Sequence, residues 1–137
     1  MKSVFFSKQK TDEEDFFDIT LNLNCPINVT GHILALAELN GRVQAKAERR
    51  RTPLYLCCDL CEDSNVMNVK MPVLRQIIRS QGGNISNPVN VLIWNKIVRD
   101  RIQSIRLYIS DINGELQPLS NCLLNGTLIF RNEKTYN

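Results

Sequence analysis

The chain has 137 residues, 43% of them hydrophobic, which suits a single domain with one buried core. Charged residues make up 23% and the formal net charge is +3, which excludes both a disordered polyelectrolyte and a histone-like cation. No window approaches the roughly 18 apolar residues of a membrane span, and polar residues follow directly after Phe5 and Phe6, so we expect neither a span nor a secretory signal peptide.

Strand signals begin near the N-terminus. Residues 3–7 are a strand candidate within an extended arm that we place over residues 1–16, which ends in the acidic run 12–15. Residues 17–24 then alternate between apolar and polar, which puts Phe17, Ile19, Leu21 and Leu23 on one face. This alternation predicts a half-buried strand.

The next segment is ambiguous between strand and helix. We favour a strand over residues 33–39 and a turn at Asn40-Gly41, because both residues tolerate a positive φ. Residues 43–51 then form either a short helix or a charged loop. Residues 73–79 are equally good helix formers, and we favour a strand there as well.

Four further runs complete the pattern. Strand candidates cover residues 54–60, 91–98, 104–110 and 127–131, and Asn-Gly pairs at 113–114 and 125–126 mark further turns. Counting residues 73–78, this gives eight strands at even spacing, the signature of a sandwich or barrel. We therefore predict an all-β protein, a single eight-stranded antiparallel jelly-roll sandwich that occupies residues 1–137 as one domain.

The cysteines do not predict a disulfide framework or a metal site. Their number is odd, which fits free thiols in a reducing compartment; they are Cys25, Cys57, Cys58, Cys61 and Cys122. Cys58 and Cys61 have the spacing of zinc and redox centres, but no second pair matches them. We favour a packing role, and the functions of residues 57, 58 and 61 stay open.

Catalytic signals are weak. His32 is the one histidine and has no nucleophile motif beside it, and Gly82-Gly83 is not followed by the lysine of a phosphate-binding loop. We predict no enzyme, no catalytic residue and no cofactor.

A basic run is the clearest candidate for partner binding. Five cations fall within ten residues, namely Arg42, Lys46, Arg49, Arg50 and Arg51. Gathered on one side of the fold, they would suit an anionic partner, either packaged DNA or an acidic protein segment. The alternative is a solvated loop, since Glu48 interrupts the run and no aromatic residue does.

Six segments, in this order and spacing, carry a resemblance over nearly the whole chain. They are FDITL at 17–21, ILALAEL at 33–39, LYLCCDL at 54–60, MPVLRQI at 71–77, IRLYISDING at 105–114 and GTLIFR at 126–131. The chain resembles the single jelly-roll, penton-like minor capsid proteins of Polinton/Maverick, adintovirus and virophage-like elements. It departs from them in its cysteine-rich segment 57–61 and its arginines 49–51.

The resemblance implies a viral or virus-derived structural protein that forms pentamers at capsid vertices, contacts the major capsid protein and resides in a virion or virus-like particle. It also favours strands at both ambiguous segments. Apolar residues on the second face of some strands would then form the subunit interface; the candidates are Leu34, Leu36, Leu92, Trp94 and Ile129. The alternative is that both faces are buried within one sandwich.

Two other classes of function stay open. A cytokine-like or lectin-like jelly-roll binding module would be secreted and would carry paired cysteines. A small nucleic-acid-binding β-barrel would place stacking aromatics beside the arginines, and Tyr55, Trp94 and Tyr108 are the available ones.

Overall fold

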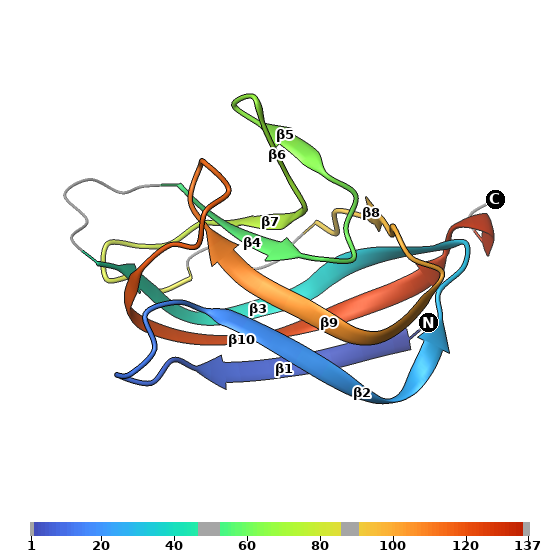
Figure 1. The fold of residues 1–137 in the computed structure, drawn as a ribbon, viewed down its shortest axis with the longest axis horizontal. Coiled ribbons are helices and arrows are strands. Elements are labelled where there is room, and N and C mark those ends of the chain that lie inside the picture. Colours follow the sequence, from blue (N-terminus) through green and yellow to red (C-terminus); the bar gives the residue numbers. More distant parts are fainter. Residues whose placement is uncertain (1, 47–52, 86–90, 136–137) are drawn as a thin grey trace.

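A computed structural model describes residues 2–46, 53–85 and 91–135 of the chain (Figure 1). Apart from one 3-10 turn, every regular element in these ranges is a β-strand, and all strands pair antiparallel. None of the described residues forms a helix of the length and hydrophobicity that crossing a membrane requires. The elements are β1 (Lys2–Gln9), β2 (Asp18–Asn28), β3 (His32–Ala45), β4 (Leu54–Cys58), β5 (Ser64–Val66), β6 (Val69–Met71), β7 (Val73–Ile77), β8 (Asn95–Lys96), β9 (Arg101–Ser110), β10 (Leu119–Asn132) and η1 (Glu133–Thr135).

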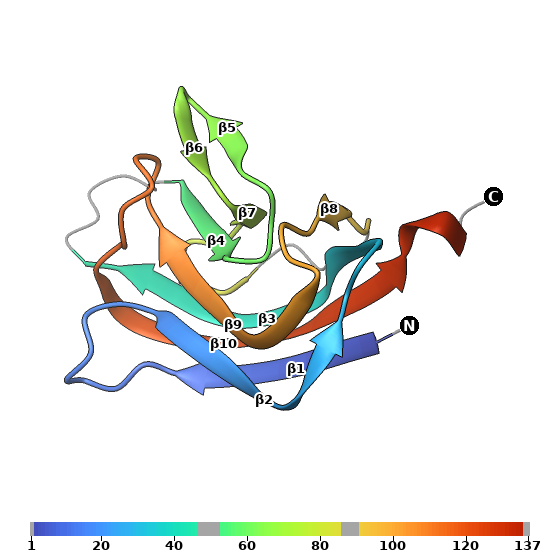
Figure 2. The same cartoon turned by 45° about the vertical axis from the view of Figure 1, so that its right-hand side comes forward.

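Two four-stranded sheets form a sandwich. The first sheet has the order β1-β10-β3-β8 and the second has the order β2-β9-β4-β7, while β5 and β6 make a separate ribbon. In Figures 1 and 2 the second sheet lies in front of the first, with β2 and β9 crossing over β1 and β10. The all-β, antiparallel prediction is therefore confirmed, with ten strands in place of eight.

The alternation seen in the sequence produces the core. On β9, Ile105, Leu107 and Ile109 are fully buried between the sheets, while Arg106 and Tyr108 point away. On β2, the alternate apolar residues predicted to face inward pack against the same core. Burying alternate residues on both sheets is what holds the two layers together, since each large apolar side chain removed from water contributes about 1.5–3 kcal/mol.

The Asn-Gly pairs differ in outcome. Residues 111–116 form the predicted turn, in which the Gly114 amide donates to the Asp111 carbonyl oxygen at 3.2 Å. The turns predicted at residues 40–41 and 125–126 are wrong, because both pairs lie inside long strands. Gly41, in β3, has a φ of +133° and sits so close to the Leu123 carbonyl oxygen that a Cβ would overlap it. Both glycines thus serve close strand packing.

Several predicted segments change in extent. Residues 73–77 form β7, so strand was the right choice there, whereas within residues 91–98 only Asn95–Lys96 is a strand. Of residues 43–51, the first three end β3, Lys46 begins a turn, and residues 47–51 lie outside the described part. Residues 2–9 form the edge strand β1 of the first sheet and not a separate arm.

The additional strands β5 and β6 form a hairpin that stands out from the sandwich (Figure 2). Its two turn residues, Met67 and Asn68, have positive φ values of 49° and 74°, which match the right-handed twist of a two-residue hairpin. At its base, buried Met71 accepts a hydrogen bond at sulfur from the Ser110 hydroxyl at 3.5 Å. The base of the hairpin therefore packs against the second sheet.

Candidate interaction surfaces

The predicted basic patch is only partly within the described residues. Arg42 and Lys46 alternate on the exposed face at the end of β3, and residues 49–51 lie outside the described ranges. Arg42 Nε donates to the Gly82 carbonyl oxygen at 2.9 Å, and Gln44 Nε2 donates to the same oxygen at 3.1 Å. The guanidinium of Arg42 is thus engaged with its own chain on one side.

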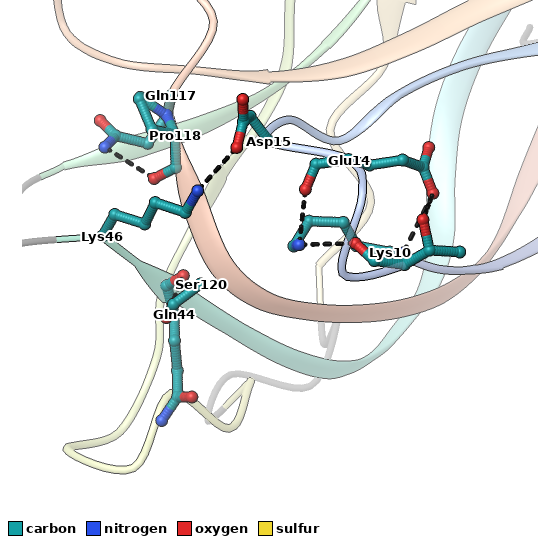
Figure 3. Close-up of polar contacts among 9 residues, drawn as sticks. Lys10, Glu14, Asp15, Gln44, Lys46, Gln117, Pro118 and Ser120 are labelled. Atoms are coloured by element: carbon teal, nitrogen blue, oxygen red, sulfur yellow. Dashed lines mark hydrogen bonds and ion pairs between the residues drawn. The ribbon is translucent and has the colours of Figure 1, made fainter.

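Lys46 has an acidic partner in the loop that precedes β2. Its Nζ lies 2.7 Å from Asp15 Oδ1 (Figure 3). Its backbone amide donates to the Pro118 carbonyl oxygen at 3.0 Å. The hydrogen bond and charge of Lys46 lower the pKa of Asp15 below its usual value. The positive charge of Lys46 is therefore partly neutralised.

The same loop holds a second group of opposite charges. Glu14 Oε1 accepts hydrogen bonds from the amide and hydroxyl of Thr11, each at 3.0 Å, and lies 3.4 Å from Lys8 Nζ. The backbone hydrogen bond from Thr11, then its hydroxyl and Lys8, lower the pKa of Glu14. Lys10 Nζ donates to the Thr11 and Glu14 carbonyl oxygens, as Figure 3 shows. The described surface here carries mixed charge and is not a uniform cationic face.

The predicted interface residues on β3 lie in the core. Leu34 is fully buried and Leu36 is 1% exposed, because they point inward opposite Phe130 and Leu128 of β10. They do not present a surface to a partner, and the placement of these two at an interface is wrong. Ile129 points to the outer face of the first sheet but is only 9% exposed.

Trp94 packs within its own chain. The guanidinium carbon of Arg131 lies 3.8 Å from the centroid of the Trp94 ring, a distance typical of a cation–π contact. Arg131 stands opposite Ile33 on the outer face of β3 and β10. This stack lies beside the buried outer-face residues Ile33 and Ile129. Of the five predicted interface residues, Leu92 is the most accessible, at 40% exposed.

Exposed apolar side chains gather on the two opposite flanks of the sandwich. One flank is formed by the edge strands β1 and β2 and the other by β7 and β8, as both ribbon views show. The β1–β2 flank carries Phe5, 66% exposed, and Phe16. The β7–β8 flank carries a larger group, which consists of Ile78, Val91, Leu92, Ile93 and Val98.

A pocket of about 640 Å³ lies at the base of the hairpin. Its lining is mostly acidic and polar, and consists of Asp59, Cys61, Glu62, Asp63, Asn65, Lys70, Pro72 and Val98. One Asp59 oxygen accepts the Arg106 amide at 3.0 Å, and the other lies 3.5 Å from Arg99. The pocket was missed in the sequence because the hairpin was not predicted; Asn68 between two valine-containing runs was its one signal.

Beside this pocket, an ion pair crosses the outer face of the second sheet. The Arg106 guanidinium donates to both carboxylate oxygens of Asp18, at 2.9 and 2.8 Å, and lies over the Tyr108 ring at 4.4 Å from its centroid. Burial, followed by the nearby Cys57, raises the pKa of Tyr108 to about 12. This face is occupied by contacts within the chain.

The Cys-x-x-Cys segment is a tight turn inside the protein. The Cys61 amide donates to the Cys58 carbonyl oxygen at 3.1 Å, and both thiols are buried. The hydrogen bond with the Cys58 thiol, followed by burial, strongly raises the pKa of Cys61. A protonated thiol is a poor nucleophile and a poor metal ligand. Across residues 2–46, 53–85 and 91–135 no cluster of three or more His, Cys, Asp or Glu could hold a metal ion.

Comparison with known protein families finds no family model that matches the chain, and comparison with curated proteins finds no match either.

Proposed function

We propose that this chain is a structural capsid protein: a single jelly roll that assembles into homo-pentamers, serves as a penton-like vertex or minor capsid component, and contacts a major capsid protein. The observation that carries the proposal is the order in which the strands pair.

That order supports the jelly roll. With the hairpin β5–β6 treated as an insertion, eight strands remain, and antiparallel pairs join the first strand to the last and continue inward. These pairs are β1 with β10, β2 with β9, β3 with β8 and β4 with β7. A long hairpin rolled into two facing sheets has this pairing, which is that of the jelly roll found in viral capsid and lectin domains.

The exposed apolar groups support assembly of one chain with copies of itself. The β1–β2 flank and the β7–β8 flank carry different side chains and lie on opposite sides of the sandwich. A contact between unlike surfaces is head-to-tail, and repeated head-to-tail contacts close into a ring when the rotation between copies allows it. A pentamer around a vertex is such a ring.

We assign the contact with the major capsid protein to the protruding hairpin. Met67 at its tip is 76% exposed, and its unbranched thioether side chain adapts to irregular surfaces. In the ribbon views the hairpin rises from the side of the sandwich where β7 lies and projects beyond it, which leaves its tip accessible.

Light scattering on the purified protein after size-exclusion chromatography tests the proposal. One chain has a mass of 15.7 kDa, so a pentamer is five times that, about 79 kDa. A peak at this mass supports the proposal. A trimer favours a cytokine-like or lectin-like binding module instead, and a monomer at millimolar concentration contradicts self-assembly.

A further inference from the structure

Three asparagine–glycine pairs have the same local chemistry and different surroundings. The pair at 113–114 lies in the turn between β9 and β10, whereas the pair at 40–41 lies inside β3 and the pair at 125–126 inside β10. Asparagine followed by glycine is the most prone to spontaneous deamidation, because glycine has no side chain to obstruct attack by its own amide nitrogen. The fold therefore decides which of the three pairs can react.

The two pairs inside strands are held on both sides. Residues 125–126 pair with β1 on one side and with β3 on the other. Gly41 pairs with Leu124 of β10, and on its other side its carbonyl oxygen accepts the Ile85 amide at 2.9 Å. Deamidation requires the backbone to turn until the side-chain carbon of asparagine reaches the next amide nitrogen. A doubly paired strand permits this only after it opens, which costs up to the full free energy of unfolding.

The pair in the turn is held mainly by one residue, Asp111. Its Oδ1 accepts the amides of Asn113 and Glu115 at 2.8 and 3.1 Å. Its carbonyl oxygen accepts the Gly114 amide at 3.2 Å, the long end of the hydrogen-bond range. Asn113 is exposed, and among the described residues its side-chain amide has no hydrogen-bond partner. The reacting side chain can therefore rotate, and a single long hydrogen bond holds the attacking nitrogen.

We propose that Asn113 is a site of spontaneous deamidation, and that the folded chain protects the other two asparagine–glycine pairs. The Gly114 amide nitrogen gives up its proton and forms a bond to Cγ of Asn113. The bond from Cγ to Nδ2 breaks, and Nδ2 leaves with one added proton as ammonia, so that a five-membered succinimide ring remains. Water then adds to either ring carbonyl and opens the ring to aspartate or isoaspartate. This inference goes beyond the proposed function and does not depend on it.

The modified turn lies against the hairpin. A Cβ at Gly114 would lie 3.4 Å from Val69 Cγ1 and 3.7 Å from Met71 Cε, so this residue packs beside β6. Isoaspartate adds one carbon atom to the main chain, which displaces residue 114 by about 1.5 Å, one bond length. Either product also places a third carboxylate between Asp111 and Glu115, and like charges repel. We therefore expect the modified turn to hold the hairpin less tightly.

Hydrogen exchange tests the effect on the hairpin. Protein aged at mildly alkaline pH is separated by ion exchange into unmodified and deamidated chains, which differ by one charge. We expect the amides of β5 and β6 to exchange faster in the deamidated chain, and the amides of β9 to exchange at the same rate in both. Equal exchange of the hairpin amides in the two chains would overturn the coupling between the turn and the hairpin.

Peptide mapping by mass spectrometry over the same incubation tests the site itself. In the folded protein, the mass gain of an amide-to-acid change should appear at residue 113 at least about tenfold faster than at residues 40 and 125, because only the strand pairs must open first. In concentrated urea no strand protects them, so all three sites should react at similar rates. Similar rates in the folded protein, or no reaction at residue 113, would overturn the proposal.

Two variants test whether the turn controls the rate. Asp111→Ala removes two hydrogen bonds to the turn, so deamidation at residue 113 should become roughly tenfold faster. The matched control is Glu115→Ala, which removes a neighbouring negative charge and none of these bonds, and should leave the rate close to that of the wild type. Equal rates in Asp111→Ala and the wild type would contradict control by the turn. Asn113→Gln should abolish the reaction at this position, and an unchanged mass gain there would contradict the succinimide route.

Discussion

The substitution Gly126→Ala tests whether β10 runs unbroken between β1 and β3. A Cβ at residue 126 would lie 2.5 Å from Phe6 Cζ, 2.7 Å from Phe6 Cε1 and 2.8 Å from the Glu38 carbonyl oxygen. Ordinary contacts of this kind are about 3.5–4.0 Å, so the Phe6 ring would have to move by about 1 Å inside a packed core. Phe6 is 2% exposed and has little room to do so.

The expected cost follows from overpacking. Forcing one methyl group into a close-packed site costs about 1–3 kcal/mol. Replacing glycine by alanine also stabilises the protein by about 0.5 kcal/mol, because it lowers the conformational entropy of the unfolded chain. We therefore expect Gly126→Ala to lower the free energy of unfolding by about 1–2.5 kcal/mol. With an m-value of about 1–3 kcal/mol per molar urea, the midpoint should fall by on the order of 1 M.

Shortening Phe6 supplies the specific control. Phe6→Leu removes the ring atoms that the new methyl group would meet. The double variant should therefore be more stable than the sum of the two single-variant losses in unfolding free energy predicts, by about 1 kcal/mol or more. Urea unfolding followed by far-UV circular dichroism gives all three values. A coupling energy near zero would refute the close approach, and would be expected if residues 125–126 formed an open turn.

Three further predictions concern single contacts. Arg131→Ala should shift the emission of Trp94 to longer wavelength and lower the free energy of unfolding by about 0.5–2 kcal/mol, measured by fluorescence-detected urea unfolding; an unchanged spectrum argues against the stack. Lys46→Ala should raise the pKa of Asp15 toward its usual value, measured by NMR at the carboxyl carbon of Asp15. An unchanged pKa of Asp15 would contradict the ion pair. Burial raises the pKa of the Cys122 thiol to about 12, above the pKa of the same thiol in the unfolded chain. The stability that the buried, protonated thiol contributes is therefore complete below pH 9. It is lost as the pH rises toward 12, at up to about 1.4 kcal/mol per pH unit. Urea midpoints at pH 8 and pH 10.5 should therefore diverge less in Cys122→Val than in the wild type, and equal divergence would contradict this.

The sequence predicted the strands wherever one face is exposed to solvent and the other is buried in the core. Ile105, Leu107 and Ile109 alternate with polar residues because only one side of β9 faces the core. On β3, residues 33–36 are apolar on both faces, so alternation could not tell the inside from the outside. Leu34 and Leu36 face the core because the second sheet packs on that side of β3. That packing involves strands distant in the sequence, so the local pattern could not show it.

The glycine errors have a similar cause. A turn and a close approach of two strands both require glycine, and the local pattern is the same in each. What distinguishes Gly126 is the Phe6 ring, 120 residues away in the chain, and what distinguishes Gly41 is the Leu123 carbonyl group. The pocket and its hairpin were missed because β5 and β6 have three residues each, too few to show a period.

The proposal that this sandwich is a ring-forming capsid subunit is tested most directly by the rotational symmetry of the purified assembly in negative-stain electron microscopy. We expect class averages with five-fold symmetry, built from subunits joined flank to flank. Rings of another symmetry would contradict the penton-like assignment, and particles of single-chain size would contradict assembly through the flanks.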